Sequence, residues 1–304
     1  MNPKLIVNPM AARGQVGKRW PEIHEVLKHE GWPFEVVFTE RRGHAMELAR
    51  QALDSGFDLI VAVGGDGTLN EVVNGMLENG QAVNSEAALG VISSGTGSDF
   101  VRTVGIPRDV LAAARSLVHA RTVRPLDVGE VTCTNDGRPL HRYFANVAGM
   151  GFDAEVVDQL ERGGKRGGGT LPYLTTLITT IARYQNKDVS VHLDDQALQG
   201  RVNDVIVCNG KYFGGGMRIA PHATLEDGAF DVIILGDFST VEILMNTPKI
   251  YNGTHLTLAK VSECRSSTVR VETNQPMLIE ADGELIGQGP ALFQILPGAL
   301  KLRV

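Results

Sequence analysis

A glycine-rich loop with one carboxylate follows the most apolar segment of the chain. The run Leu59–Val63 is continuously hydrophobic, as parallel strands covered on both faces tend to be, and Gly64-Gly65-Asp66-Gly67-Thr68 comes directly after it. Glycines let the backbone approach a ligand closely, and a helix predicted from about Leu69 to Leu77 would offer unpaired N–H groups to an anion. An ordinary tight turn would explain Gly-Gly-Asp-Gly equally well. The loop is neither a Walker A motif nor the dinucleotide G-x-G-x-x-G fingerprint.

Two further loops with similar chemistry follow other predicted strands. Ser93–Phe100 comes after the strand predicted at Leu89–Ile92 and combines glycines and hydroxyls with the carboxylate of Asp99. Asn8–Gly14 comes after the first apolar run of the chain. The carboxyl ends of parallel strands meet at one edge of a doubly wound sheet, where ligands bind. The three loops together therefore indicate a polyphosphate site, with Asp66 and Asp99 available for magnesium.

The elements that would position these loops differ between the two halves of the chain. The first ~125 residues alternate strands with helices, which favours a parallel sheet covered on both faces; strands are predicted at Leu5–Val7, Glu35–Phe38, Leu59–Val63 and Leu89–Ile92, and helices at Ala45–Leu53, Leu69–Leu77 and Val110–Val118. The second half favours an antiparallel β domain, with short runs at Val128–Thr132, Arg142–Val147, Val189–Leu193, Val202–Cys208, Phe230–Leu235, Thr268–Glu272 and Met277–Ala281. Helices are predicted there at Tyr173–Tyr184 and Thr240–Asn246.

Composition excludes several classes of protein. The chain has 304 residues, which suits two domains, and a net charge of −6, which argues against a nucleic-acid-binding face. Three scattered cysteines form neither a disulfide framework nor a zinc site. The sequence shows neither a signal peptide nor a spanning apolar segment, so we expect a cytoplasmic protein. Its 35 glycines exceed the ~21 of average usage, and one run, Gly163–Gly169, has no assigned role.

The ordered set of motifs resembles the diacylglycerol kinase catalytic-domain family, which includes soluble bacterial lipid kinases and sphingosine and ceramide kinases. NAD kinases share only the Gly-Gly-Asp-Gly-Thr core. The matching segments cover nearly the whole chain: Asn8-Pro9 with Gly14, Thr39 with Gly43-His44-Ala45, Gly64–Glu71, Gly95–Arg102, Gly214-Gly215-Gly216, Ile219-Ala220-Pro221, Glu226-Asp227-Gly228 and Asp282-Gly283-Glu284. Ser98 stands where the family usually has Asn.

The resemblance implies an α/β fold in two parts. These are an N-terminal three-layer α/β nucleotide-binding domain, residues 1–126 with 292–304 returning to it, and a β-rich antiparallel sandwich, residues 127–291. The active site would lie in the cleft between them.

The resemblance also implies roles for individual residues. ATP would be bound by Asn8, Gly14, Thr39, Gly65, Asp66, Gly67, Thr68, Leu69, Asn70, Glu71 and Thr96. Asp66, Asp99 and Asp127 would form an acidic set near the catalytic Mg²⁺, because hard cations take oxygen ligands. Local sequence leaves simpler alternatives open: a strand-end hydroxyl for Thr39, a helix cap for Asp99, and backbone N–H binding in a turn for Asp127.

Three further assignments come from the same resemblance. Glu284 would be the base that takes the proton of the acceptor hydroxyl, although Asp282-Gly283 is also a good hairpin turn. A structural magnesium would be held by Asp227 with the carbonyls of Thr224 and Ala229, where the alternative is a β-turn. Arg102 and Lys18 are candidate phosphate contacts or plain surface charges.

These observations predict an ATP- and Mg²⁺-dependent lipid kinase that phosphorylates the hydroxyl of diacylglycerol. We expect transient peripheral contact with a membrane and no nucleic acid, and the resemblance leaves a homodimer open. The alternatives are another acceptor (ceramide, sphingosine, phosphatidylglycerol or NAD) and a non-catalytic regulator that binds nucleotide. Retention of the acidic residues argues against the regulator.

Overall fold

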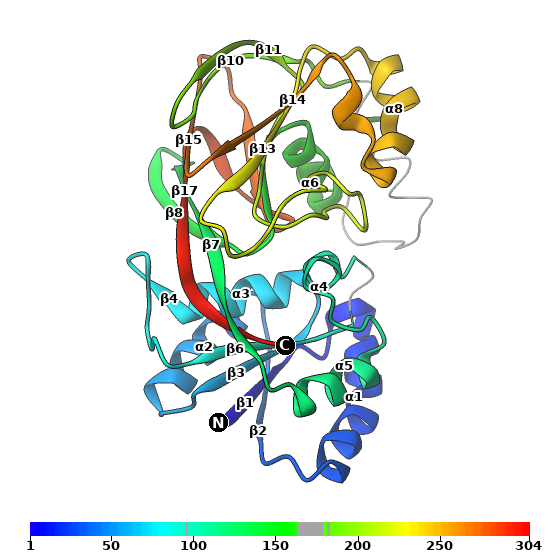
Figure 1. Cartoon of the computed structure of the whole chain (residues 1–304), viewed down its shortest axis with the longest axis vertical. Coiled ribbons are helices and arrows are strands. Elements are labelled where there is room, and N and C mark those ends of the chain that lie inside the picture. Colours follow the sequence, from blue (N-terminus) through cyan, green and yellow to red (C-terminus); the bar gives the residue numbers. More distant parts are fainter. Residues whose placement is uncertain (95–96, 163–178, 181–182) are drawn as a thin grey trace.

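The computed structural model describes residues 1–94, 97–162, 179–180 and 183–304. The chain forms a lower and an upper layered unit, and both termini lie in the lower one (Figure 1). The lower unit contains the strands β1 (Pro3–Val7), β2 (Glu35–Phe38), β3 (Leu59–Gly64) and β6 (Ala88–Ser93), with the small pair β4 (Leu77–Glu78) and β5 (Gln81–Ala82). Its helices are α1 (Ala11–His29), α2 (His44–Asp54), α3 (Asp66–Met76), α4 (Asp99–Val104) and α5 (Val110–His119).

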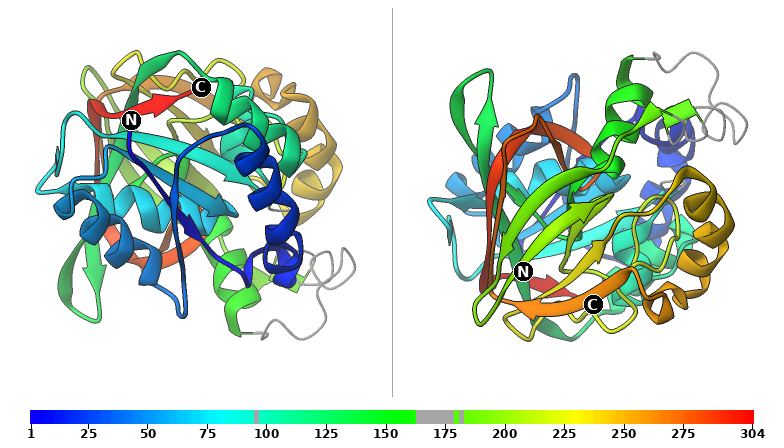
Figure 2. Two further views of the ribbon diagram at one scale, coloured as in Figure 1. Left: turned by 90° about the horizontal axis from the view of Figure 1, so that it is seen from below. Right: turned by 90° about the horizontal axis from the view of Figure 1, so that it is seen from above.

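The strands of the lower unit form a parallel sheet in the order β2-β1-β3-β6. Successive side chains of a strand point to opposite faces. Leu59, Val61 and Val63 of β3 accordingly pack with α1 and α5, whereas Ile60 and Ala62 pack with α2 and α3. Figure 2 shows these two layers of helices on opposite sides of the strands. The three-layer α/β fold is thereby confirmed.

The upper unit is built from antiparallel strands. They are β7 (Val123–Asn135), β8 (Arg138–Phe144), β9 (Val147–Gly151), β10 (Lys187–His192), β11 (Ala197–Val202), β12 (Asp204–Cys208), β13 (Phe230–Leu235), β14 (Val261–Ser266), β15 (Thr268–Thr273), β16 (Leu278–Ala281) and β17 (Glu284–Arg303). One buried cluster contains residues of β7, β8, β9, β10, β12, β13, β15, β16 and β17, which confirms the predicted β-rich sandwich. The helices α6 (Phe152–Arg162) and α8 (Thr240–Asn252) and the short η1 (His255–Thr257) accompany it.

Two long strands connect the units. β17 pairs with β16 and β15 in the upper unit, and its end runs parallel to β6 through Lys301↔Ala88 and Leu302↔Leu89. β7 runs antiparallel to β17 along most of this length. Because the sheet hydrogen bonds continue from one unit into the other, the loops at the edge of β3 and β6 face the upper unit across a fixed distance.

Some sequence predictions were wrong or incomplete. The predicted strand Val202–Cys208 is two strands, β11 and β12, separated at Asn203, and the predicted strand Arg142–Val147 is divided between β8 and β9. Helix α1 was not predicted, because Gly14, Gly17 and Pro21 interrupt its pattern, and residues 12–14 indeed have left-handed backbone angles. The helices α4 and α6 were also missed. Most of the predicted helix Tyr173–Tyr184 lies outside the described residues, as does the Gly163–Gly169 run.

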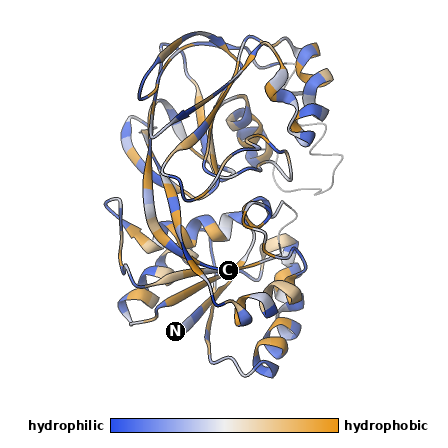
Figure 3. Ribbon diagram, in the orientation of Figure 1, coloured by the Kyte–Doolittle hydropathy of each residue, from blue (hydrophilic) through white to orange (hydrophobic). Residues whose placement is uncertain are grey.

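The hydropathy of the elements matches this layered arrangement. Figure 3 shows apolar residues concentrated on the strands inside both units. Among the described residues, no helix combines the length and the apolar character that crossing a membrane requires.

Candidate active site

Asp66 lies where two of the predicted loops meet. It is the first residue of α3, and the backbone N–H groups of Ser98, Asp99 and Phe100 at the start of α4 favour the charged form of its carboxylate. Burial raises the pKa of Asp66, and these N–H groups oppose that rise. The carboxylate at the end of the loop after β3 therefore lies beside the start of α4.

Asp99 connects this edge of the sheet to the upper unit. Its Oδ2 accepts a 2.8 Å hydrogen bond from the N–H of Gly215. Gly214, Gly215 and Gly216 all have positive φ angles of 57°, 85° and 109°, a conformation that favours glycine, and this backbone turns its N–H groups toward Asp99. Burial is the largest cause of a raised pKa at Asp99, and the nearby charge of Asp66 adds to it.

The two carboxylates converge on Gly97. A Cβ atom added there would lie 3.1 Å from Asp66 Oδ2 and 3.5 Å from Asp99 Oδ2. Asp99 Oδ1 is buried without a hydrogen-bond partner in the described structure, and the nearest cation, Arg102 Nε, is 3.9 Å away. Two desolvated carboxylates with one unused oxygen fit a divalent cation, since Mg²⁺ is commonly held by one or two carboxylates together with substrate phosphates.

Glu284, at the start of β17, lies beside the Gly64–Thr68 loop. A Cβ on Gly67 would be 3.7 Å from Glu284 Oε1. The side chain is 17% exposed, and its Oε2 is 3.6 Å from Arg42 Nη2 and 3.5 Å from Arg142 Nη2. The structure thus brings Glu284 to the Gly64–Glu71 loop, where an acceptor hydroxyl would meet a bound phosphate.

The turn before Glu284 is fixed by Asp282. Its Oδ1 accepts hydrogen bonds from the N–H groups of Asn146 (3.0 Å) and Val147 (3.1 Å), and its Oδ2 accepts from the N–H of Ala145 (2.9 Å) and from Asn70 Nδ2 (2.9 Å). Burial nevertheless raises the pKa of Asp282 to about 6. Asp282 is therefore a positioning residue for this turn.

Several of the residues predicted to bind nucleotide make contacts within the protein. Asn70 is fully buried and also donates to the carbonyl of Tyr143. Glu71 accepts from the N–H groups of Gly43 (2.7 Å) and Ala45 (2.9 Å) and so caps the N-terminus of α2. Leu69 is buried and lines a cavity described below. These contacts fix the shape of the loop.

The remaining predicted nucleotide residues lie at the ends of β1, β2 and β3. Asn8 Nδ2 donates to Thr68 Oγ1 at 3.0 Å, and Thr39 continues β2 through its N–H bond to Val7. Gly14 has a φ angle of 80° at the start of α1. They surround the same sheet edge as Asp66. Thr96 lies outside the described residues.

Asp127 is not brought to Asp66 and Asp99 by any contact in the described structure. Its Oδ2 accepts from the N–H of Gly228 at 2.7 Å, and its Oδ1 accepts from the N–H of Gly298 at 2.6 Å. These are the contacts of the alternative interpretation, in which Asp127 satisfies backbone groups at a turn. It therefore stabilises the junction of β7, β17 and the Thr224–Ala229 loop.

Asp227, the predicted carboxylate ligand of a structural magnesium, is paired with an arginine. Asp227 forms an ion pair with Arg265, and its Oδ1 accepts from the N–H of Ala229 at 3.3 Å. Across the described ranges, no three acidic, histidine or cysteine side chains gather as a metal site. An ion held by Asp227 and the carbonyls of Thr224 and Ala229 would have to compete with Arg265 for the carboxylate, and no step below depends on this site.

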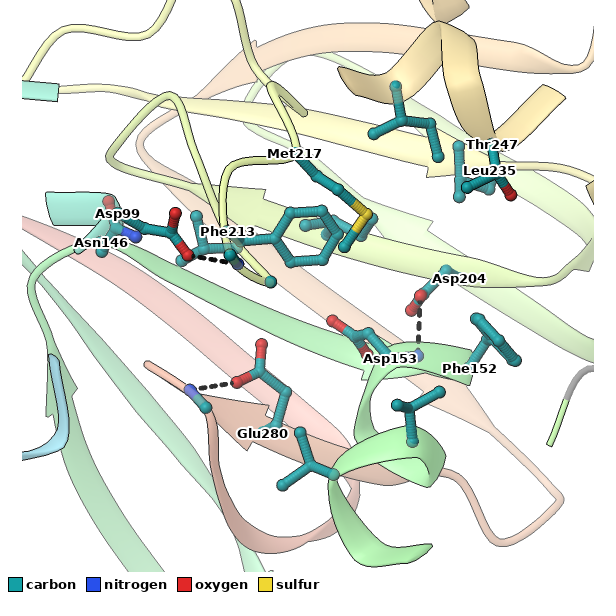
Figure 4. Close-up of a pocket in the computed structure, with 18 of the residues that line it drawn as sticks. Asp99, Asn146, Phe152, Asp153, Asp204, Phe213, Met217, Leu235, Thr247 and Glu280 are labelled. Atoms are coloured by element: carbon teal, nitrogen blue, oxygen red, sulfur yellow. Dashed lines mark hydrogen bonds between the residues drawn. The ribbon is translucent and has the colours of Figure 1, made fainter. Parts of the chain in front are cut away.

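The candidate phosphoryl-transfer groups open into an apolar cavity of about 360 Å³. Asp66, Asp99 and Asp282 line one end of it, and its walls are mostly apolar, including Leu69, Phe100, Val147, Phe152, Val156, Leu160, Phe213, Met217, Leu235, Ile243, Ile250 and Val261. Figure 4 shows side chains from the strands and from α6 and α8 pointing into it. The cavity therefore combines several carboxylates with a mostly apolar wall.

Sequence reasoning missed a second acidic group in this cavity. Asp153, Asp204 and Glu280 face one another there (Figure 4), with the N–H of Asp153 donating to Asp204 Oδ2 at 3.0 Å. Burial raises the pKa of all three, that of Asp153 to about 6. They come from α6, β12 and β16, and no motif or spacing in the sequence connects them.

Comparison with known proteins gives matches over both units. The diacylglycerol kinase catalytic domain matches residues 2–131, and the YegS C-terminal NAD kinase beta sandwich-like domain matches residues 146–304. Diacylglycerol kinase of Bacillus subtilis is 30% identical over 291 residues, covering 95% of this chain and 92% of the relative. A probable lipid kinase YegS-like of Alcanivorax borkumensis is 30% identical over 90% of this chain and 88% of its own.

A solved structure agrees with these relatives. The crystal structure of a putative diacylglycerol kinase from Bacillus anthracis superposes with a TM-score of 0.76 at 26% identity, covering 99% of this chain and 96% of that one. Both sequence and fold thus match along the full length. The chain therefore belongs to the diacylglycerol kinase catalytic-domain family and is a lipid kinase, a phosphotransferase with an alcohol group as acceptor.

Proposed function

We propose that this lipid kinase transfers the γ-phosphoryl group of ATP to the free hydroxyl of diacylglycerol and forms phosphatidic acid, in a reaction that requires Mg²⁺. The observation that carries the proposal is that the Asp66–Asp99 pair lines an apolar cavity while Glu284 lies beside Gly67, the residue that follows Asp66. The names of the relatives support diacylglycerol as the acceptor.

The nucleotide lies on the loops of the lower unit in this proposal. The backbone N–H groups of Gly65 and Gly67 and the loops beginning at Asn8 and at Gly97 face the phosphates, as glycine-rich loops at helix starts do in other nucleotide sites. Asn70 and Glu71 keep these loops in place through the contacts described above. Thr96 completes the phosphate-facing set predicted from the sequence.

Asp66 and Asp99 hold the cation. Bound Mg²⁺ would neutralise the charge that develops on the phosphate oxygens during transfer. The unused oxygen of Asp99 and the raised pKa values of both carboxyls fit this role, because a cation at this position would favour their charged forms.

Glu284 takes the proton of the acceptor hydroxyl. The oxygen of that hydroxyl forms a bond to the γ-phosphorus, the bond from phosphorus to the bridging oxygen breaks, and ADP leaves with the electron pair. Arg42 and Arg142 lie within 3.6 Å of the Glu284 carboxylate and orient it. The apolar cavity excludes water from this step.

A product analysis tests the proposal. γ-Labelled ATP and Mg²⁺ are supplied with micelles of diacylglycerol, ceramide, sphingosine or phosphatidylglycerol, and separately with NAD, and the products are separated. Label in phosphatidic acid, lost when Mg²⁺ is chelated, is the expected result. Label in another lipid corrects the acceptor, label in NADP contradicts the lipid assignment, and ATP binding without transfer to any acceptor indicates a regulator.

A further inference from the structure

Helix α8 carries apolar side chains on two opposite sides. It begins with a capping box in which Ser239 and Glu242 satisfy each other's backbone N–H groups, and it ends at Gly253. Ile243, Thr247 and Ile250, spaced three or four residues apart, face the cavity together with Asn246. At 3.6 residues per turn these positions form one stripe along the helix. One side of α8 is thus a wall of the proposed acceptor cavity.

The opposite stripe of α8 is apolar and faces solvent. Val241, Leu244, Met245 and Tyr251 have exposed fractions of 63%, 45%, 74% and 47%, and Pro248 lies among them. Half of the eight large hydrophobic side chains exposed in the described structure are on this one helix. A solvent-facing helix side normally carries polar residues, and a gathered apolar patch marks an interaction surface. Figure 3 shows this apolar content on α8 at the outer side of the upper unit.

We propose that the outer stripe of α8, formed by Val241, Leu244, Met245 and Tyr251, docks the kinase on the surface of a phospholipid bilayer. The acceptor then passes from the bilayer along α8 into the cavity that the inner stripe lines. The inference rests on the lipid kinase activity and adds to the proposed function the surface through which the acceptor arrives.

The geometry favours a bilayer over a second copy of the chain. A helix of 13 residues is about 20 Å long, and one stripe of it offers a few hundred Å² at most, whereas a standard protein interface buries about 800 Å² on each partner. A bilayer needs no such area, because a few apolar side chains at the headgroup boundary suffice for reversible binding. An acyl chain also requires an apolar space inside the protein, and the inner side of α8 lines such a cavity.

The charges on α8 permit contact with phospholipid. Glu242 is the sole acidic residue of this helix, and its carboxylate is bound by Lys260 Nζ at 2.7 and 2.8 Å. Lys249 is the sole basic residue of the helix and lies beside the outer stripe. An anionic headgroup would therefore meet no unbalanced negative charge on α8.

Vesicle binding tests the proposal with the full chain. The double variant Leu244→Gln/Met245→Gln removes the centre of the stripe and leaves the cavity-facing residues intact. Its matched control is Val123→Gln, which changes a 39% exposed apolar side chain at the start of β7. Co-sedimentation with phosphatidylcholine–phosphatidylglycerol vesicles, without ATP or diacylglycerol, is expected to show at least tenfold weaker binding of the double variant and unchanged binding of the control.

An activity comparison separates docking from damage to the cavity. Turnover of an acceptor embedded in vesicles should fall with vesicle binding, while turnover of a short-chain acceptor dispersed as monomers should stay within twofold of wild type. Three results would overturn the proposal: unchanged vesicle binding, an equal loss on the dispersed acceptor, or a wild-type dimer that the double variant dissociates in sedimentation velocity. Because vesicle binding is measured without nucleotide or acceptor, an error in the proposed acceptor would not alter that result.

Discussion

The side-chain amide of Asn70 donates a 2.9 Å hydrogen bond to the carboxylate of Asp282, which is 212 residues further along the chain. Asn70 lies on α3 directly after the Gly64–Thr68 loop, and Asp282 begins the turn that leads to Glu284. This contact joins the phosphate-facing loop of one unit to the proposed base of the other. The distance between Glu284 and Gly67 therefore depends on it.

Replacing Asn70 with alanine should impair transfer more than nucleotide binding. The change removes one of the two donors to the Tyr143 carbonyl and one of the two donors to Asp282 Oδ2, and the loss of a hydrogen bond to a charged group costs about 1.5–3 kcal/mol of unfolding free energy. We expect at least a tenfold drop in kcat with the KM for ATP changed less than threefold. Gln51→Ala on the exposed side of α2 is the matched control. Wild-type kcat in Asn70→Ala would show that the contact does not position Glu284.

The substitution Asp99→Asn should lower turnover and raise the free energy of unfolding. Asparagine can still accept from the N–H of Gly215 and removes a buried negative charge beside Asp66. The raised folded-state pKa of Asp99 means that wild type loses stability as pH rises above the ordinary aspartate value. The variant's advantage in urea unfolding should therefore grow from pH 4 to pH 7, while turnover falls at least 100-fold. A variant that is active and no more stable than wild type at pH 7 would contradict the proposed cation role.

The group formed by Asp153, Asp204 and Glu280 should also make the free energy of unfolding fall as pH rises, as Asp99 does. The pKa of Asp153 is raised to about 6, so the folded state holds protons that the unfolded state has released between about pH 4 and pH 6. Stability from this group is present at low pH and is lost as pH rises through that window. The stability of Asp204→Asn relative to wild type should thus increase between pH 4 and pH 7, measured by urea unfolding. An advantage that shrinks with rising pH would refute this reading.

Asp127→Asn separates a structural role from a catalytic one. Both carboxylate oxygens accept backbone N–H groups, and asparagine offers only one acceptor in their place. We expect a loss of about 1–3 kcal/mol in unfolding free energy, with kcat of the folded enzyme within about fivefold of wild type. If stability is retained and kcat falls 100-fold or more, Asp127 belongs to the catalytic acidic set after all.

The sequence predicted the fold class correctly, for physical reasons. A short apolar run rich in β-branched residues, such as Leu59–Val63, favours a buried strand, and Asp66 and Asp99 follow two such strands, β3 and β6, at one edge of the sheet. Helix α1 escaped prediction because its glycines and proline resemble a loop pattern, although Val16, Ile23 and Leu27 bury one side of it.

What the sequence could not reveal depends on distant partners. Glu71 belongs to a motif that predicts nucleotide binding. Its carboxylate nevertheless caps helix α2, by accepting hydrogen bonds from the N–H groups of Ala45 and Gly43, 26 and 28 residues earlier in the chain. Asp204 and Glu280 sit inside strands where alternation predicts only inward or outward directions, so their meeting with Asp153 follows from how β12 and β16 pack around β9. The spacing of residues along the sequence does not predict contacts of this kind.

The central claim is that Asp66, Asp99 and Glu284 together transfer a phosphoryl group to a lipid alcohol. Its most direct test is single-turnover transfer from γ-labelled ATP with Mg²⁺ to diacylglycerol micelles, measured for wild type and Glu284→Gln alongside the ATP dissociation constant of each. We predict rapid labelling of phosphatidic acid by wild type, at least 1,000-fold slower labelling by Glu284→Gln, and ATP affinities within threefold. Labelling by Glu284→Gln at nearly the wild-type rate would contradict the claim.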